Sequence, residues 1–302
     1  MSPDPDQSLL DPEDRDFLSY TWSSLPWSPW VPFTATKEEF RQIPREPGLC
    51  RIKPIGKNFL MYIGETRRTI HERINELRQT LRRTGLMPWN DPHTTAPSLW
   101  AWQDAEGFEY ECSATPLDAS QSGRRGMESF LLYRYRQEHC ESTLCNFGRF
   151  HPRYRKSTNR KENKRGGKLD ENHKDNPAGG PGIPPLTING TPGERDWMGL
   201  AWSGMRSLDG ENVGIVPSGA GLYLLFEHAT GDLVCIGQSA DCAKRLRSHA
   251  MKFLDEKDLL FSSHIVEKPV LPHNLKELEN DLIGNYFEHY RKAPRYQFGN
   301  SR

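Results

Sequence analysis

The chain has 302 residues, a mass of 34.7 kDa and 35% hydrophobic residues, enough for about two modest domains. Its mean hydropathy of −0.77 and the lack of a long apolar run argue against a membrane-embedded protein. The acidic N-terminus has no apolar segment typical of a signal peptide, and six cysteines without zinc-type spacing predict a reduced, cytoplasmic protein. Lysine plus arginine equals aspartate plus glutamate at 40 each, so only the distribution of charge is informative.

That distribution divides the chain. Residues 149–168 hold nine basic residues and one acidic residue, and the stretch that follows is rich in glycine and proline. We therefore predict an N-terminal domain over 1–168, with an acidic tail and a basic C-terminal extension. A flexible linker over 169–190 and a C-terminal domain over 191–302 follow.

The two parts resemble each other in sequence. Trp22-Ser23 recurs as Trp202-Ser203, 180 positions later, and Ile63-Gly64 recurs as Ile236-Gly237, 173 positions later. This period is far too long for a solenoid, and the matches occur in the same order. The pattern predicts one domain that has been duplicated.

The same elements are expected in both parts, in chain order. Apolar runs around Gly-containing turns predict β-hairpins, and apolar stripes at helical spacing predict helices after Thr66 and Ser239. Later strands and helices complete each part. The expected strands are 48–54, 59–66, 108–117, 221–228, 233–238 and 262–270, and the second helices begin near Glu128 and Glu279. Each part is hairpin, helix, strand, helix, so the predicted fold class is α+β.

Four chemical features recur in this order. A strand carries Tyr-Ile-Gly or Cys-Ile-Gly, an arginine follows at the next helix, a glutamate opens the later helix, and an amide follows it by 18 residues. The residues are Tyr62, Arg73, Glu128 and Asn146, then Cys235, Arg245, Glu279 and Gln297.

These residue types suit phosphodiester chemistry. A carboxylate can hold Mg²⁺, a guanidinium can clamp phosphate oxygens, and a phenol can help to deprotonate water. The glycine is expected to let a phosphate backbone approach closely. Taken singly, such an arginine is usually solvated and such a glutamate usually interacts with the helix dipole. The ordered set, present twice, favours the functional interpretation.

The strings GLC…MYIGETRRTIHER and GLYLL…CIGQSADCAKRLRSH, each with its later glutamate and amide, resemble GIY-YIG endonuclease domains. The resemblance covers about 46–148 and 218–300. It implies, for each part, a small three-stranded antiparallel sheet flanked by helices. It also implies DNA cleavage with one divalent metal, as in repair, homing and restriction.

The resemblance assigns a role to each matching residue. Glu128 and Glu279 would bind the metal, and Arg73 and Arg245 would contact the scissile phosphate. The remaining roles fall to five residues. Tyr62 and Tyr223 would activate or orient water, and His249 would be an accessory histidine. Asn146 would brace the first site, and Gln297 would take the place of this asparagine in the second.

The departures from the family pattern differ between the two parts. Cys50 and Cys235 stand where one motif tyrosine belongs, Leu77 stands where the histidine belongs, and Gln297 replaces the asparagine. The two cysteines are small buried strand residues in one interpretation and a redox or metal pair in the other. Which part is the better catalyst stays open.

Two further features have alternative interpretations. His93 is interpreted as a loop histidine, with a DNA contact as the alternative. The Trp-rich segments are expected to pack on their own sheets rather than stack on bases.

We therefore expect a metal-dependent DNA endonuclease that uses Mg²⁺ or Mn²⁺, in restriction or defence, with repair second. The alternative is a nucleic-acid-binding protein whose nuclease domains are degenerate or only nick. The basic run is the expected DNA contact, with a solvated linker as its alternative. Its residues are Arg149, Arg153, Arg155, Lys156, Arg160, Lys161, Lys164 and Arg165. Recognition sequence, RNA cleavage and oligomeric state, a monomer included, stay open.

Overall fold

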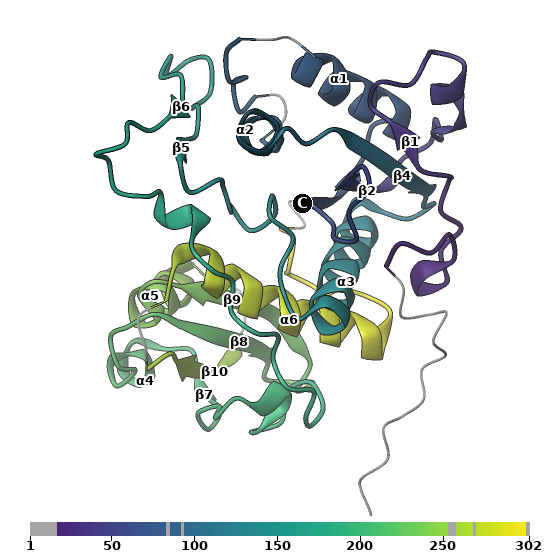
Figure 1. Cartoon of the computed structure of the whole chain (residues 1–302). Coiled ribbons are helices and arrows are strands. Elements are labelled where there is room, and N and C mark those ends of the chain that lie inside the picture. The colour runs from purple at the N-terminus through teal and green to yellow at the C-terminus, as the bar shows by residue number, and fades with distance from the viewer. Residues whose placement is uncertain (1–16, 83–84, 92–93, 253–257, 268–269, 300–302) are drawn as a thin grey trace, which may run out of the picture.

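The computed structural model describes residues 17–82, 85–91, 94–252, 258–267 and 270–299. The acidic tail over 1–16 and His93 lie outside the described residues. The described chain forms two α+β halves that meet through one helix from each (Figure 1). No helix in these ranges combines the length and apolar character needed to cross a bilayer.

The first half is built on an antiparallel sheet with the strand order β1-β4-β2-β3. Its strands are β1 (Val31–Pro32), β2 (Gly48–Pro54), β3 (Tyr62–Thr66) and β4 (Tyr110–Pro116). Helices α1 (Ile70–Arg82) and α2 (Ala96–Glu106) cover one face, and α3 (Gln121–His139) covers the other.

The second half repeats this arrangement with the order β7-β10-β8-β9. Its strands are β7 (Arg206–Ser207), β8 (Gly221–Glu227), β9 (Leu233–Ser239) and β10 (Leu259–Ile265). Helices α4 (Gly210–Gly214) and α5 (Cys242–Lys252) lie on one face, and α6 (Pro272–Tyr290) lies on the other. The α+β prediction is confirmed, but each sheet has a fourth strand because a two-residue strand pairs with its outer edge.

The tryptophans correct the register of the repeat. Trp22 and Trp197 each open a short 3-10 turn, and the residue that follows has φ 56° or 57°. Trp27 donates to the Trp22 carbonyl at 3.0 Å, and Trp202 donates to the Trp197 carbonyl at 3.1 Å. Trp22 therefore matches Trp197, 175 positions later, and the expected match with Trp202 is wrong. All four rings are buried beside their own sheets, as expected.

Helices α3 and α6 begin earlier than predicted. Ser120 caps α3 by accepting a hydrogen bond from the Gly123 N–H at 3.1 Å, and Pro272 occupies the first position of α6. Glu128 and Glu279 therefore lie about two turns inside their helices, where an interaction with the helix dipole no longer explains them. Helices α2 and α4 were not predicted.

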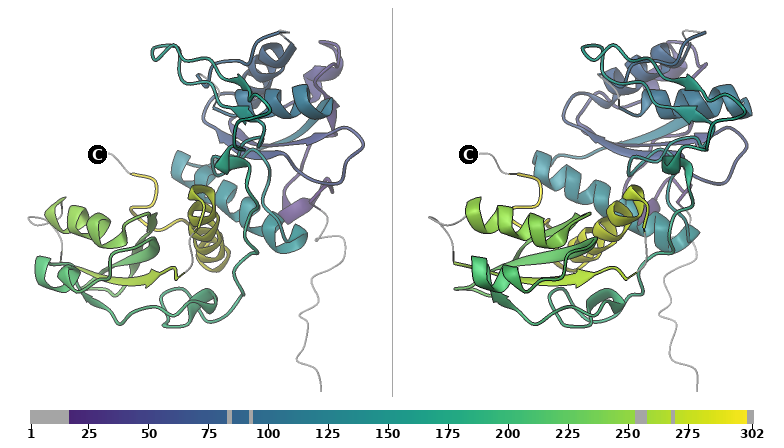
Figure 2. Two further views of the ribbon diagram at one scale, coloured as in Figure 1. Left: turned by 60° about the vertical axis from the view of Figure 1, so that its left-hand side comes forward. Right: turned by 90° about the vertical axis from the view of Figure 1, so that its left-hand side faces the viewer.

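The two halves are joined by α3 and α6, which lie between the two sheets (Figure 2). Both helices have 19 residues, so positions 151 apart are equivalent. Asn280 donates to the Ser129 carbonyl at 3.1 Å, and a Cβ on Gly284 would lie 2.2 Å from the Cβ of Tyr133. Each contact joins equivalent positions, which is the pattern of a two-fold axis between the helices.

A buried ion pair joins α3 to α6 within this interface. Arg136 Nε lies 2.7 Å from Asp281 Oδ1, and both side chains are completely buried. The segment predicted to be a flexible linker also lies here. Leu186 N–H donates to Asp281 Oδ2 at 3.0 Å, and Arg136 donates to the Pro184 carbonyl at 3.3 Å. The segment therefore contacts both helices, while the domain boundaries stay a prediction.

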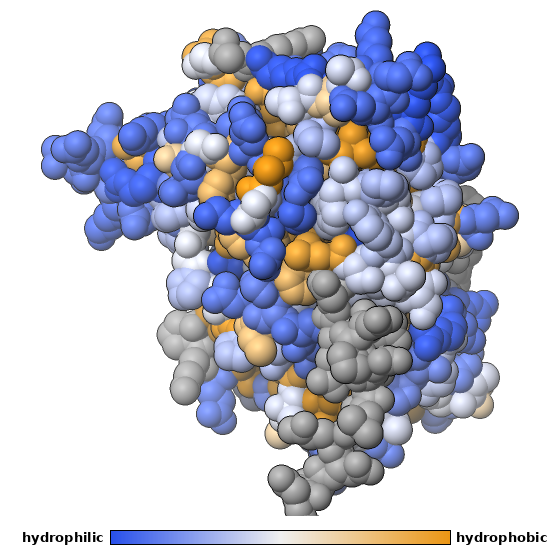
Figure 3. Space-filling model, turned by 45° about the vertical axis from the view of Figure 1, so that its right-hand side comes forward, coloured by the Kyte–Doolittle hydropathy of each residue, from blue (hydrophilic) through white to orange (hydrophobic). Residues whose placement is uncertain are grey.

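The exterior is polar. On the face drawn in Figure 3 the surface is largely hydrophilic, and hydrophobic residues show only in small separate groups. The apolar side chains instead fill layers on both faces of each sheet.

The buried ion pair gives a stability prediction. Asp281→Ala removes both hydrogen bonds of the Arg136 guanidinium to Asp281 and leaves only the buried Glu277 carboxylate, 3.7 Å away, which should lower the free energy of unfolding by about 3 kcal/mol. Arg136→Met with Asp281→Leu and Glu277→Gln should recover most of that loss, because none of the three charges is then buried alone. Urea unfolding measures both, with Glu211→Ala, at an exposed position of α4, as the control. A loss below about 1 kcal/mol for Asp281→Ala would contradict this account.

Candidate active sites and nucleic-acid interface

An amide ties the motif strand in each half. Asn146 accepts from the Ile63 N–H at 3.0 Å and donates to the Ile63 carbonyl at 2.8 Å. Gln297 makes the same pair of bonds to Ile236, both at 2.8 Å. The expected replacement of asparagine by glutamine therefore has a geometric basis. Both amides hold the strand backbone, so we treat them as positioning residues.

A tyrosine ring covers the motif glycine in each half. A Cβ on Gly64 would lie 2.2 Å from the Tyr62 hydroxyl, and a Cβ on Gly237 would lie 2.2 Å from Tyr223 Cζ. Tyr62 reaches its glycine along the same strand, whereas Tyr223 reaches across from β8, where it pairs with Gly237. The two tyrosines thus come from different motif positions but occupy the same place. The glycine makes room for this ring, which corrects the expectation that it makes room for a phosphate.

The cysteines are structural in this arrangement. Cys50 is 3% exposed and pairs with Gly64 on the neighbouring strand. Burial raises the pKa of Cys50 and of Cys235 to about 12. All six cysteines, each of them described, are thiols. Cys50 and Cys235 lie in different halves, so the interpretation as small buried residues fits and the paired interpretation does not.

The two glutamates occupy equivalent environments. Glu128 accepts a hydrogen bond from the Glu65 N–H, and Glu279 accepts one from the Gln238 N–H. Burial raises the pKa of each carboxyl to about 7, and in the first half the nearby Glu65 carboxylate adds to the shift. Each glutamate is thus a partly buried acid beside the motif strand, where a cation would relieve the burial of its charge.

The first site contains a second carboxylate, which the sequence interpretation missed. Glu65 Oε2 is buried and lacks a hydrogen-bond partner within the described chain, although Arg124 Nε lies 3.5 Å away as an ion pair. The charge of Arg73 acts on both Tyr62 and Glu128, so these groups gather in one place. The available signal was the residue after the motif glycine, which is Glu65 in the first half and Gln238 in the second.

In the second site, the tyrosine hydroxyl is hydrogen-bonded to a histidine that can accept its proton. The Tyr223 hydroxyl lies 3.0 Å from His249 Nε2, and Arg245 Nε donates to the same hydroxyl at 3.3 Å. Burial raises the pKa of Tyr223 to about 12, so the phenol is neutral near pH 7. The expected grouping of Tyr223, Arg245, His249 and Glu279 is therefore present in the geometry.

In the first site, a leucine stands at the position of this histidine. Leu77 is 2% exposed and belongs to the core, and the Tyr62 hydroxyl hydrogen-bonds to Thr95 instead. Burial raises the pKa of Tyr62 well above its usual value, with the charge of Glu128 adding to the shift. A threonine hydroxyl does not accept and hold a proton as an imidazole does.

The carboxylates fit a sparsely ligated Mg²⁺ ion. The described residues contain no group of three or more His, Cys, Asp or Glu side chains placed to hold a metal. Mg²⁺, however, often keeps several waters and takes only one or two protein carboxylates together with substrate phosphate. Glu128 with the orphaned oxygen of Glu65, and Glu279 alone, are compatible with that mode.

The basic run forms a projecting arm. β5 (Tyr154–Arg155) pairs with β6 (Gly167–Lys168), and the loop between them extends from the first half (Figures 1 and 2). Six basic residues of the arm are exposed, with one more partly exposed. They are Arg155, Arg160, Lys161, Lys164, Arg165 and Lys168, and then Lys156. Burial lowers the pKa of Lys156, with the nearby Lys276 adding to the shift.

Two predicted DNA contacts serve the fold instead. Arg149 is 8% exposed and donates to the Ser142 carbonyl at 2.9 Å. Arg153 bonds to Asp175 at 2.9 Å and to the His173 carbonyl at 3.1 Å. The Arg149 bond joins the start of the basic run to residues before it, and the Arg153 bonds join it to the segment that follows the arm, so we leave both residues out of the candidate interface.

Each site also borders on the other half. Arg125 lies one turn before Glu128, 4.5 Å from the Phe298 ring centroid, and bonds to the Phe298 carbonyl at 3.4 Å. Its equivalent, Lys276, places Nζ 3.3 Å from where a Cβ on Gly148 would lie. In each half, the Phe-Gly pair that follows the amide residue thus lies beside a basic residue of the other half. That basic residue, Arg125 or Lys276, stands three positions before the glutamate of its own half. The two sites are connected through the interface.

Comparisons with protein-family models, with curated proteins and with solved structures found no match to this chain. The functional interpretation therefore depends on the geometry of the two sites and on the sequence motifs.

The raised carboxyl pKa values predict a pH-dependent stability. Glu128 has a folded pKa near 7, against an ordinary value of 4.5 for a glutamate side chain. Its stabilising contribution is complete below pH 4.5 and is lost as pH rises through 7. Glu128→Gln should therefore match the wild type at pH 4.5 and exceed its unfolding free energy by about 1–3 kcal/mol at pH 8. Urea titrations at both pH values measure this, and equal stabilities at pH 8 would contradict the burial argument.

Proposed function

We propose that this chain is a metal-dependent DNA endonuclease of the GIY-YIG type with two active centres. One observation carries the proposal. Both halves gather a strand tyrosine, a helix arginine and a partly buried glutamate at the same place in the same topology. Structural ion pairs could explain one such group, but they do not explain its repetition through different motif tyrosines.

In the second centre, water attacks the phosphorus while the Tyr223 phenol accepts a hydrogen bond from that water. The proton of that water passes to the Tyr223 oxygen as the phenol gives its own proton to His249 Nε2, 3.0 Å away. The bond from phosphorus to the leaving sugar oxygen breaks, and that oxygen takes a proton from solvent. Arg245 holds the phosphate oxygens and offsets the charge of the transition state. Glu279 would hold a divalent ion, and that ion would supply Lewis-acid stabilisation of the charge.

In the first centre, Glu128 and Glu65 offer two carboxylates where the second centre has one. Arg73 faces the phosphate, and Tyr62 orients the water without a histidine to receive its proton. We propose that the first centre binds its metal more tightly and that the second centre transfers the proton more readily.

The two-fold relation between the halves suits duplex DNA. Antiparallel strands present their phosphates with two-fold symmetry, so one chain with two equivalent centres can cut both strands. The exposed arm supplies the sequence-independent attraction to phosphates. Restriction or defence is the biological setting that we propose first, and repair is second.

A second candidate is a nucleic-acid-binding protein that only nicks. It is favoured by the absence of a proton acceptor beside Tyr62, where Leu77 replaces the histidine. In that case one half would bind DNA and the other would do all the cutting.

Single-centre variants separate the two candidates. With supercoiled plasmid and Mg²⁺, Glu128→Ala and Glu279→Ala should each convert linear product into nicked circles, because one centre remains. The double variant should cut at least about 100-fold more slowly, since each metal carboxylate is then missing. Gel analysis measures this, with Glu211→Ala and EDTA as controls.

Two other outcomes would contradict the proposal of two active centres. One silent variant and one inactive variant would establish the nicking protein. Unchanged cutting in the double variant would mean that the glutamates are not the metal ligands.

The arm predicts a salt effect. Four exposed basic residues of the arm, Arg155, Arg160, Lys161 and Lys164, are replaced by serine. The slope of log affinity against log salt concentration should then become shallower by about 0.9 for each phosphate that is no longer neutralised. Fluorescence anisotropy with duplex DNA in EDTA measures the slope. A matched control replaces four exposed basic residues outside the arm by serine, namely Lys37, Arg41, Lys174 and Arg206. Equal slopes for the two variants would show that the arm is not the interface.

A further inference from the structure

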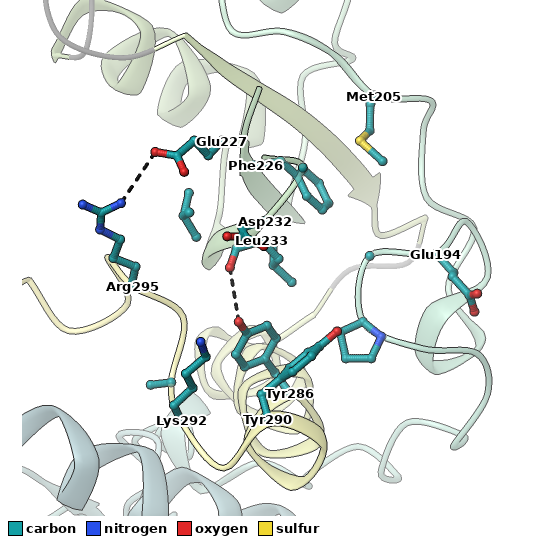
Figure 4. A pocket seen from close by; sticks show the side chains of 15 residues that line it. Glu194, Met205, Phe226, Glu227, Asp232, Leu233, Tyr286, Tyr290, Lys292 and Arg295 are labelled. Carbon is teal, nitrogen blue, oxygen red and sulfur yellow. Dashed lines mark hydrogen bonds and ion pairs between the residues drawn. The ribbon is translucent and has the colours of Figure 1, made fainter. Parts of the chain in front are cut away.

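A pocket of about 590 Å³ opens in the second half, and Glu279 is not among the residues that line it (Figure 4). Phe226, Leu233 and the rings of Tyr286 and Tyr290 line it. The two tyrosine ring centroids lie 4.6 Å apart, and Tyr290 is 49% exposed. Met205, which also lines the pocket, is 54% exposed. Large apolar groups at the mouth of a pocket are typical of a binding site.

The first half contains the equivalent pocket, and there it is nearly full. Tyr135 and His139 stand 151 positions before Tyr286 and Tyr290. Phe17 packs against both, with ring centroids 4.8 Å from Tyr135 and 5.4 Å from His139. The remaining cavity beside Leu60, Tyr135 and His139 is only about 150 Å³.

One difference in sequence accounts for the contrast. In the register set by Trp22 and Trp197, the residue equivalent to Phe17 is Pro192. Pro192 lines the larger pocket, but its small pyrrolidine ring does not fill the pocket as an aromatic ring would. The second half has therefore kept the aromatic walls of the pocket and lost the aromatic side chain that fills it in the first.

We propose that this pocket binds an aromatic side chain presented by a peptide segment of a partner protein. The first half shows the geometry, since its own Phe17 enters the equivalent pocket from the turn over residues 17–20. The charges of the pocket favour a peptide over a nucleic acid. Lys292 and Arg295 are outnumbered by the acids Glu194, Glu227 and Asp232, and Arg295 already pairs with Glu227 at 3.6 Å.

The first half also holds the backbone of the segment that carries Phe17, and the second half lacks the residue that does so. In the first half, Arg51 donates to the carbonyl of Phe17 and, at 2.8 Å, to that of Ser19. The residue at the equivalent strand position of the second half is Leu224. The partner is therefore recognised mainly through its ring and through charges beside it, as expected for a modest, reversible interaction.

The test uses the full chain and the acetylated, amidated hexapeptide Ser-Arg-Ser-Phe-Leu-Ser. This is the sequence of residues 14–19 with both aspartates replaced by serine, so that its one positive charge suits the excess of acids around the pocket. Isothermal titration should detect binding, and replacing the peptide's phenylalanine by alanine should weaken it at least tenfold. Tyr290→Ala should weaken it similarly, and Pro192→Phe should abolish it by filling the pocket. Tyr20→Ala, an exposed tyrosine of the first half, should leave it unchanged. Thermal unfolding confirms that each variant is folded.

Three results would overturn the proposal. These are no binding of the hexapeptide, equal binding of its alanine version, or binding that survives both Tyr290→Ala and Pro192→Phe. A decamer of thymidylate serves as the nucleic-acid probe. If Tyr290→Ala weakened the binding of that decamer and not of the hexapeptide, the pocket would be a nucleotide site.

Discussion

The packing of α3 against α6 is the constraint on which the rest of the structure depends. The buried pair of Arg136 and Asp281 and the close approach of Gly284 to Tyr133 leave little freedom in how the helices cross. Each helix carries one candidate metal ligand, Glu128 or Glu279, beside its own sheet. The same packing therefore joins the halves and sets the relation between the two candidate sites. The contacts of Arg125 with Phe298, and of Lys276 with Gly148, continue that relation to the edge of each site.

Much of the architecture could be predicted because hairpin and helix periodicity are local signals. Five of the six predicted strands were found within three residues of their bounds. The sixth, 262–270, was placed too late, because β10 begins at Leu259 and ends at Ile265. The start of α3 was missed because its first turn, Gln121-Ser122-Gly123, has no apolar stripe and is stabilised by the Ser120 cap. The fourth strands were missed because a two-residue pairing depends on the neighbouring strand and leaves no pattern of its own. The role of the linker segment depends on partners far away in sequence, which periodicity does not reveal.

The site residues show a similar division. Spacing indicated which residues recur, and the geometry gathers most of them, including the substitution of Asn146 by Gln297. Spacing did not indicate that the motif glycine accommodates a tyrosine ring, because Tyr62 and Tyr223 reach it from different strands. It also missed Glu65, whose importance appears only when its carboxylate lies beside Glu128. Arg149 was overvalued because composition cannot tell a solvated guanidinium from one that bonds to a buried carbonyl.

We propose that a single chain holds two equivalent metal-binding centres, which are related by the two-fold axis between α3 and α6. Anomalous diffraction from crystals soaked in Mn²⁺ tests it most directly. The account predicts one manganese peak beside Glu128 and Glu65, and a second beside Glu279, with the first better occupied at limiting metal. Saturating Mn²⁺ that left both glutamates without a peak, or peaks located only elsewhere on the chain, would contradict it.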